Sequence, residues 1–190
     1  MSNATGRLPR GVLAPIVAIV LVLASSSTVV VAALTGGIGG HNGAFEAVAC
    51  DAPSLPGAIV NVTESDMGST MMGTGLMRPS LLVDPTSVSA GKISFVVHNE
   101  GNMVHEMLVM PLPRDGAGTR PTGSDGKIDE SASLGEASQS CAAGRGDGIA
   151  PGATGWVTLD LVPGRYELIC DQPWHYAAGM FDVLTVQGDT

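Results

Sequence analysis

Three side chains able to bind a soft metal ion lie close together near the end of this 190-residue chain. Cys170, His175 and Met180 follow one another at intervals of five residues. A thiolate, an imidazole and a thioether on one short segment are the ligands that suit copper in a trigonal site with a long axial methionine. Zinc binds cysteine and histidine but not a thioether. The spacing therefore predicts a copper site, which needs a second histidine from elsewhere in the chain.

The second imidazole must come from one of the three other histidines. His41 lies in a glycine-rich stretch that would not position it. His98 lies on a predicted strand, on the same face as Ser94, where we expect it to be solvated. His105 follows a turn and opens an apolar strand, from which a side chain projects at the rim of a sheet. Elimination therefore predicts that His105 is the fourth ligand. Singly, a buried cysteine or methionine is usually a core residue, but the combination at this spacing favours the metal site.

The elements that must position these ligands are short strands. Apolar and polar residues alternate in many short runs separated by Gly and Pro, as in 92–98, where Ile93, Phe95 and Val97 share one face. This pattern is typical of an antiparallel all-β sandwich or barrel. The predicted strands cover residues 57–64, 81–84, 92–98, 105–112, 155–161, 164–170 and 180–186. The Cys170–Met180 segment thus connects the last two of them.

A long polar segment, residues 113–154, interrupts the strand pattern and is rich in Gly, Ser and Asp. A structureless loop of that length is unusual inside a compact domain. We therefore expect this insertion to contain a short helix near 129–136 and to be pinned by Cys141. The pattern does not indicate what the insertion does.

The cysteine count leaves two arrangements open. Cys50, Cys141 and Cys170 are the three cysteines of the chain. Cys50 and Cys141 form a disulfide, or all three remain thiols, because a sequence does not show whether two Cα atoms approach within bridging distance.

The first part of the chain indicates a membrane-directed segment. Residues 1–10 carry Arg7 and Arg10 and no acidic residue, and residues 11–34 carry no charge. An uncharged stretch of that length predicts a transmembrane anchor or a signal peptide, with the basic end in the cytoplasm. Residues 35–55 then form a Gly-rich tether and residues 56–190 a folded domain. We expect this domain to be membrane-anchored and extracytoplasmic, on the periplasmic or cell-surface side.

The formal net charge of −9 restricts the class of partner. A nucleic-acid-binding protein needs a basic face for the phosphates, so we expect no nucleic-acid partner. An acidic surface favours a partner protein with a basic docking patch.

Two motifs of the chain resemble the cupredoxin family, especially its rusticyanin, auracyanin and sulfocyanin type. One is the C-x4-H-x4-M segment from Cys170 to Met180, and the other runs from Phe95 through Asn99 and Gly101 to His105 and Glu106. The resemblance implies a Greek-key β-sandwich with one type 1 (blue) copper ion bound by His105, Cys170, His175 and Met180. It also implies that electrons pass through the edge of the His175 imidazole. One departure is Trp174, because such loops often have glycine directly before the histidine.

Two functions follow from this resemblance. The first is one-electron transfer to a redox partner, a cytochrome or an oxidase. The second is copper storage or delivery, in which the methionines between Met67 and Met77 bind Cu(I). Those methionines are equally compatible with a flexible apolar loop. An enzyme such as a multicopper oxidase needs several more histidines than the four present, so we expect that the protein is not an enzyme.

Overall fold

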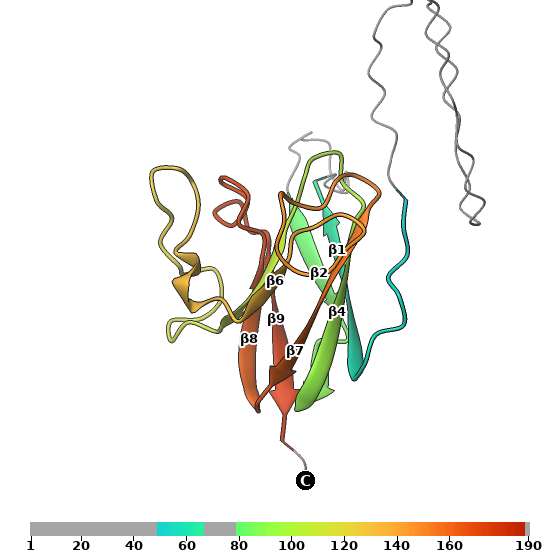
Figure 1. Ribbon diagram of the computed structural model, residues 1–190. Coiled ribbons are helices and arrows are strands. Elements are labelled where there is room, and N and C mark those ends of the chain that lie inside the picture. Colours follow the sequence, from blue (N-terminus) through green and yellow to red (C-terminus); the bar gives the residue numbers. More distant parts are fainter. Residues whose placement is uncertain (1–48, 67–78, 189–190) are drawn as a thin grey trace, which may run out of the picture. The chain divides into compact units, whose positions relative to one another are not determined.

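Two β-sheets pack face to face in the computed structural model, which describes residues 49–66 and 79–188 (Figure 1). The four-stranded sheet has the order β2-β1-β4-β7 and the five-stranded sheet the order β3-β9-β8-β5-β6. The first sheet consists of β1 (Ala58–Ser65), β2 (Ser80–Asp84), β4 (Gly91–Asn99) and β7 (Thr154–Leu161). The second consists of β3 (Ser87–Ser89), β5 (Met107–Pro111), β6 (Gly135–Ala137), β8 (Gly164–Ile169) and β9 (Phe181–Gln187). The predicted all-β sandwich is confirmed.

The prediction of purely antiparallel pairing is wrong for two strand pairs. β1 runs parallel to β4, and β3 runs parallel to β9. Period-2 alternation reports which side of a strand is buried, and it carries no information on the direction of the neighbouring strand. Both sheets are therefore mixed.

The core between the sheets is formed by alternate residues of the strands, as the sequence pattern predicts. Ile93, Phe95 and Val97 of β4 are fully buried, and they pack with Leu168 and Leu184 of the opposite sheet. The prediction that His98 is solvated is wrong in degree, because its side chain is half-buried and its Nδ1 lies 3.1 Å from Thr154 Oγ1. It lies on the outer side of β4, away from this core.

The insertion forms an additional layer over the five-stranded sheet. It contains a 3-10 helix (η1, Glu130–Ala132) and strand β6, so the helix expected near 129–136 is a single turn that ends at Ala132. Apolar side chains beneath the insertion form a second cluster on the outer face of the sheet: Leu108, Met110, Ile128, Ile169 and Tyr176. Strand β5 is consequently buried on both faces, with Met107 and Val109 in the main core.

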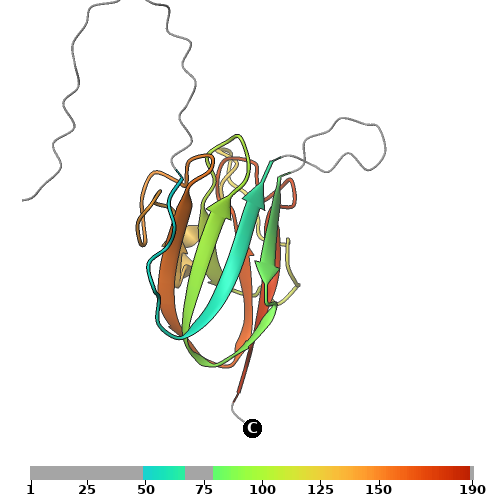
Figure 2. The ribbon, with the colours of Figure 1, turned by 90° about the vertical axis from the view of Figure 1, so that its right-hand side faces the viewer.

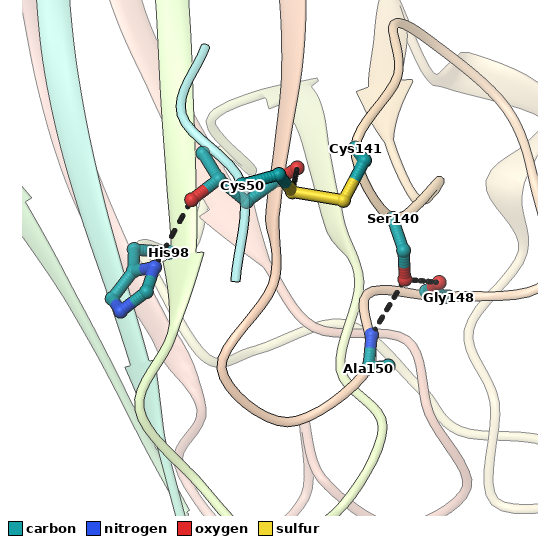
Figure 3. The surroundings of a disulfide bond; sticks show 7 residues. Cys50, His98, Ser140, Cys141, Gly148 and Ala150 are labelled. Atoms are coloured by element: carbon teal, nitrogen blue, oxygen red, sulfur yellow. Dashed lines mark hydrogen bonds between the residues drawn. A yellow bond between two sulfur atoms is a disulfide. The ribbon is translucent and has the colours of Figure 1, made fainter. Parts of the chain in front are cut away.

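A disulfide joins the insertion to the segment that precedes β1. Cys50 and Cys141 are bonded, with 5.6 Å between their Cα atoms, so the structure has the paired arrangement (Figure 3). Cys141 N–H donates to the carbonyl of Thr154, and Cys50 Sγ lies 3.7 Å from the same oxygen. From there residues 51–57 run along the outside of the four-stranded sheet to its opposite end, where β1 begins (Figure 2). Cys170 is left as a free, buried thiol.

Several sequence predictions concern residues that the structure does not describe. The predicted membrane segment 11–34, most of the tether, His41 and the Met67–Met77 stretch all lie outside residues 49–66 and 79–188. Within those two ranges, no helix is long and apolar enough to cross a membrane. The segment at 11–34 therefore stays a prediction.

Candidate metal centre

The loop between β8 and β9 carries three of the four predicted ligands. Cys170 directly follows β8 and Met180 directly precedes β9. Cys170 N–H donates to the Met180 carbonyl over 3.1 Å, and Met180 N–H donates to the His175 carbonyl over 3.0 Å. These bonds tie the two ends of the loop together and fold its middle, with His175, back over them.

The fourth predicted ligand, His105, is held between the part of the insertion around Ile149 and a turn. His105 exchanges two backbone hydrogen bonds with Ile149, at 3.1 and 2.7 Å. The buried Asn99 side chain fixes the preceding turn, since its amide donates to the carbonyls of Met103 and Ile149 and its oxygen accepts from Gly101 N–H. The His105 side chain is fully buried beside the loop.

These elements bring the nitrogen and sulfur atoms of three predicted ligands together. His105 Nδ1 and His175 Nδ1 are 3.2 Å apart, and Cys170 Sγ lies 3.8 Å from the first and 3.4 Å from the second. Hydrogen bonds alone would not require all three atoms to converge. A point inside this triangle lies about 2 Å from each of the three atoms. This distance is close to the length of a bond from nitrogen or sulfur to a first-row metal ion, which is about 2.0–2.3 Å. The donor set therefore fits one trigonally bound metal ion.

Met180 is the remaining one of the four predicted ligands, and it is fully buried at the end of the loop. Its backbone is hydrogen-bonded to both Cys170 and His175, as described above. The residues in this cluster thus include a thioether, which copper sites accept as a weak axial ligand.

Burial keeps both imidazoles uncharged at neutral pH. Burial and the nearby His175 lower the pKa of His105 to about 4, against the opposing effect of the Asp66 carboxylate. Burial also lowers the pKa of His175, again opposed by Asp66. A metal ion binds the neutral form of histidine, so both side chains are ready for binding without losing a proton.

The pKa of the Cys170 thiol is shifted in the opposite direction. Burial, followed by the charge of Glu64, raises the pKa of this thiol well above its usual range. The backbone N–H groups of Gln172 and Glu106 donate to its sulfur and act in the other direction. In the metal-free protein Cys170 is therefore protonated, and a bound metal ion must displace that proton.

Sequence reasoning did not find the polar groups that surround these ligands. An added Cβ at Gly101 would lie 2.6 Å from Asp66 Oδ1 and 2.8 Å from His105 Nε2, so glycine is needed where the turn passes these two side chains. Glu106, Glu130 and Asp171 form a second group whose carboxylate oxygens lie within 4.8 Å of one another. Glu106 and Asp171 had a signal in the sequence, because they directly follow His105 and Cys170. The position of Glu130 had none, because it depends on how the insertion folds.

Comparison with known proteins agrees with this arrangement. The sequence profile of the copper binding proteins of the plastocyanin/azurin family matches residues 83–187, which is more than half of the chain. A search of curated protein sequences finds no match to this chain.

Several solved structures of auracyanin and rusticyanin are similar to this chain. Reduced auracyanin from Roseiflexus castenholzii has 19% sequence identity and a TM-score of 0.46, with 69% of this chain and 99% of that chain covered. Rusticyanin from Thiobacillus ferrooxidans has 22% identity and a TM-score of 0.42, with 70% and 79% covered. Auracyanin B has 20% identity and a TM-score of 0.44, with 72% and 93% covered.

The family profile covers all strands from β3 to β9 and both segments that carry the converging side chains. On this match, the chain belongs to the plastocyanin/azurin family of copper-binding proteins, whose cofactor is a copper ion.

Proposed function

We propose that His105, Cys170, His175 and Met180 bind one type 1 copper ion and that the protein transfers single electrons between partner proteins. The observation that carries this proposal is the triangle of two Nδ1 atoms and one Sγ atom around a point about 2 Å from each. Bound copper supplies the redox couple between Cu(I) and Cu(II). The chain supplies a fixed set of ligands, with the Cys170 thiolate as the strong one and Met180 as the weak one.

The surface around His175 supports electron transfer at this end of the molecule. His105, Cys170 and Met180 are fully buried, whereas His175 is partly exposed. Trp174, which precedes it, is 58% exposed, so an apolar side chain stands at the surface directly beside this histidine in the sequence. A partner protein that docks at Trp174 comes within reach of the His175 ring.

A carrier is favoured over an enzyme by the number of metal-binding groups. Among the described residues, one cluster combines histidine and cysteine side chains, and the other consists of carboxylates alone. Enzymes of the multicopper type need further histidine ligands, and the chain has four histidines in all.

We also propose that the domain is extracytoplasmic and tethered to a membrane through residues 11–34. The uncharged sequence of that segment supports an anchor, and the Cys50–Cys141 disulfide suits an oxidising compartment. The mass of the mature protein purified from cell membranes tests both points. A soluble mature chain that lacks residues 11–34 would contradict the anchor.

The copper assignment is tested by loading the purified full-length protein with Cu(II) and recording its visible spectrum. We expect an intense thiolate-to-copper charge-transfer band, which the Cys170→Ser variant loses. Cys50→Ser is the matched control, because it removes a cysteine that is not a proposed ligand and should keep the band. His105→Gly should lose the band in the same way, while His98→Gly should keep it. A colourless wild-type protein, or a band that persists in Cys170→Ser, would contradict the proposed site.

A further inference from the structure

The insertion makes several polar contacts with the loop that carries Cys170 and His175. The Gly126 carbonyl accepts from Trp174 N–H over 2.9 Å, and Ile128 N–H donates to Asp171 Oδ1 over 2.7 Å. Arg120 N–H donates to the Tyr176 hydroxyl over 3.1 Å. The insertion thus fastens the metal-binding loop from outside at three places.

Lys127 lies between two of these contacts and points into the cluster of three carboxylates. Its Nζ is 3.3 Å from Glu106 Oε1, 3.8 Å from Asp171 Oδ2 and 3.9 Å from Glu130 Oε1. The side chain of Asp171 is fully buried and that of Glu106 is 11% exposed. Three converging carboxylates resemble a cation site, and in this protein the Lys127 ammonium group is the cation.

Two of these carboxylates belong to residues that directly follow proposed ligands. Glu106 follows His105, and its backbone N–H also donates to Cys170 Sγ. Asp171 follows Cys170, and its Oδ2 atom has no hydrogen-bond partner among the described residues. Buried carboxylates without a counter-charge are costly. The Lys127 ammonium group supplies this counter-charge where the segment that carries His105 meets the segment that carries Cys170.

We propose that Lys127 is a positioning residue for the copper site, whose ammonium group pairs with the carboxyl groups of Glu106 and Asp171 and thereby raises the reduction potential. The proposal rests on the proposed function, because it concerns the potential of the ion held by His105 and Cys170. Negative charge near copper favours Cu(II) over Cu(I), and a nearby positive charge opposes this. Hydrogen bonding and charge around the ligand sulfur are known means by which a protein sets the potential of such a site.

The test compares the reduction potentials and visible spectra of copper-loaded full-length variants. In Lys127→Met we expect the preference for Cu(II) over Cu(I) to rise by about tenfold, which is a potential lower by about 59 mV for one electron. The charge-transfer band should persist. Lys127→Arg keeps the positive charge and should stay close to wild type.

Two further variants separate charge from structure. Lys92→Met removes a lysine whose exposed ion pair with Asp160 lies near the start of β4, far from the loop, and should leave the potential unchanged. The double variant Lys127→Met/Glu106→Gln removes one positive and one negative charge, so its potential should return toward that of the wild type.

Each outcome decides the question. An unchanged potential in Lys127→Met, or a double variant further from wild type than the single one, overturns the role of Lys127. Loss of the band in both Lys127→Met and Lys127→Arg would assign the residue a purely structural role and also overturns the proposal. A wild-type protein without the band overturns the proposed function itself, which distinguishes the two failures.

Discussion

Protonation of individual side chains determines how metal binding depends on pH. Burial lowers the pKa of His105 to about 4 and lowers that of His175, so both rings lack the extra proton at neutral pH. Burial raises the pKa of the Cys170 thiol, which therefore keeps its proton in the metal-free protein. At the proposed site, binding of one copper ion at neutral pH should therefore release one proton, from Cys170.

The first prediction follows from this proton count. Between about pH 6.5 and 8, the apparent Cu(II) affinity should rise about tenfold per pH unit, because the metal competes with one proton. Below that range the slope should steepen as the histidines begin to bind protons, with His105 protonated only near pH 4. Competition titrations against a chelator at several pH values measure the slope. A slope of two or more at pH 7 would show that a histidine is protonated in the apo protein.

At the residue scale, the sequence was informative where ligands share a short segment. Spacing alone singled out Cys170, His175 and Met180 as candidate ligands, and elimination singled out His105. Lys127 carried no such signal, because its approach to Glu106 depends on a chain reversal inside the insertion. Trp174 adopts a φ of +69°, a conformation that favours glycine. This backbone geometry gives a physical reason why glycine suits the position before the histidine.

At the element scale, the insertion acts as a cover that fixes the metal-binding loop. Its turn approaches the loop so closely that an added Cβ at Gly126 would lie 2.7 Å from the Trp174 indole. Gly116, in the same insertion and also at positive φ, faces open space within 4 Å. The two glycines form a natural pair for testing the contact.

We predict that Gly126→Ala destabilises the protein more than Gly116→Ala. Both changes place a side chain in a left-handed conformation, which costs about 1 kcal/mol. Gly126→Ala adds a clash with Trp174, and overpacking of this kind costs about 1–3 kcal/mol more. The free energy of unfolding in urea and the rate of copper release from the loaded protein measure the two effects. Equal losses in the two variants would mean that the insertion does not press on the loop.

Strand prediction failed where elements are too short to show a pattern. β3 and β6 have three residues each, and period-2 alternation needs more residues than that to be recognised. The burial of β5 on both faces was predictable from the sequence, because Met107–Met110 is continuously apolar, as expected of such a strand. No sequence pattern predicted that β1 runs parallel to β4.

At the scale of the whole molecule, the Cys50–Cys141 disulfide closes a loop across most of the domain. The two cysteines are 91 residues apart in sequence. Cross-linking over such a distance restricts the unfolded chain strongly, and removal of a native disulfide costs about 2–5 kcal/mol.

We predict that Cys50→Ser lowers the free energy of unfolding of the apo protein by about 2–4 kcal/mol. The charge-transfer band of the copper-loaded variant should remain, since neither cysteine belongs to the proposed site. Urea unfolding with and without a thiol reductant provides the control, because the reductant should destabilise wild type and leave Cys50→Ser unchanged. An equal response of both proteins would contradict the assignment of the bond.

The path of the chain before β1 also determines which end of the domain faces an electrode when the protein is immobilised on it. Cys50 contacts Thr154, the first residue of β7, at the end of the sandwich that bears the metal-binding loop. β9 leads away from that loop and ends with Gln187 at the opposite end of the sandwich (Figure 1). Immobilisation through the C-terminus therefore leaves His175 facing the solution. Immobilisation through the residues before Cys50 brings His175 to the conducting surface, for as long as the disulfide is intact.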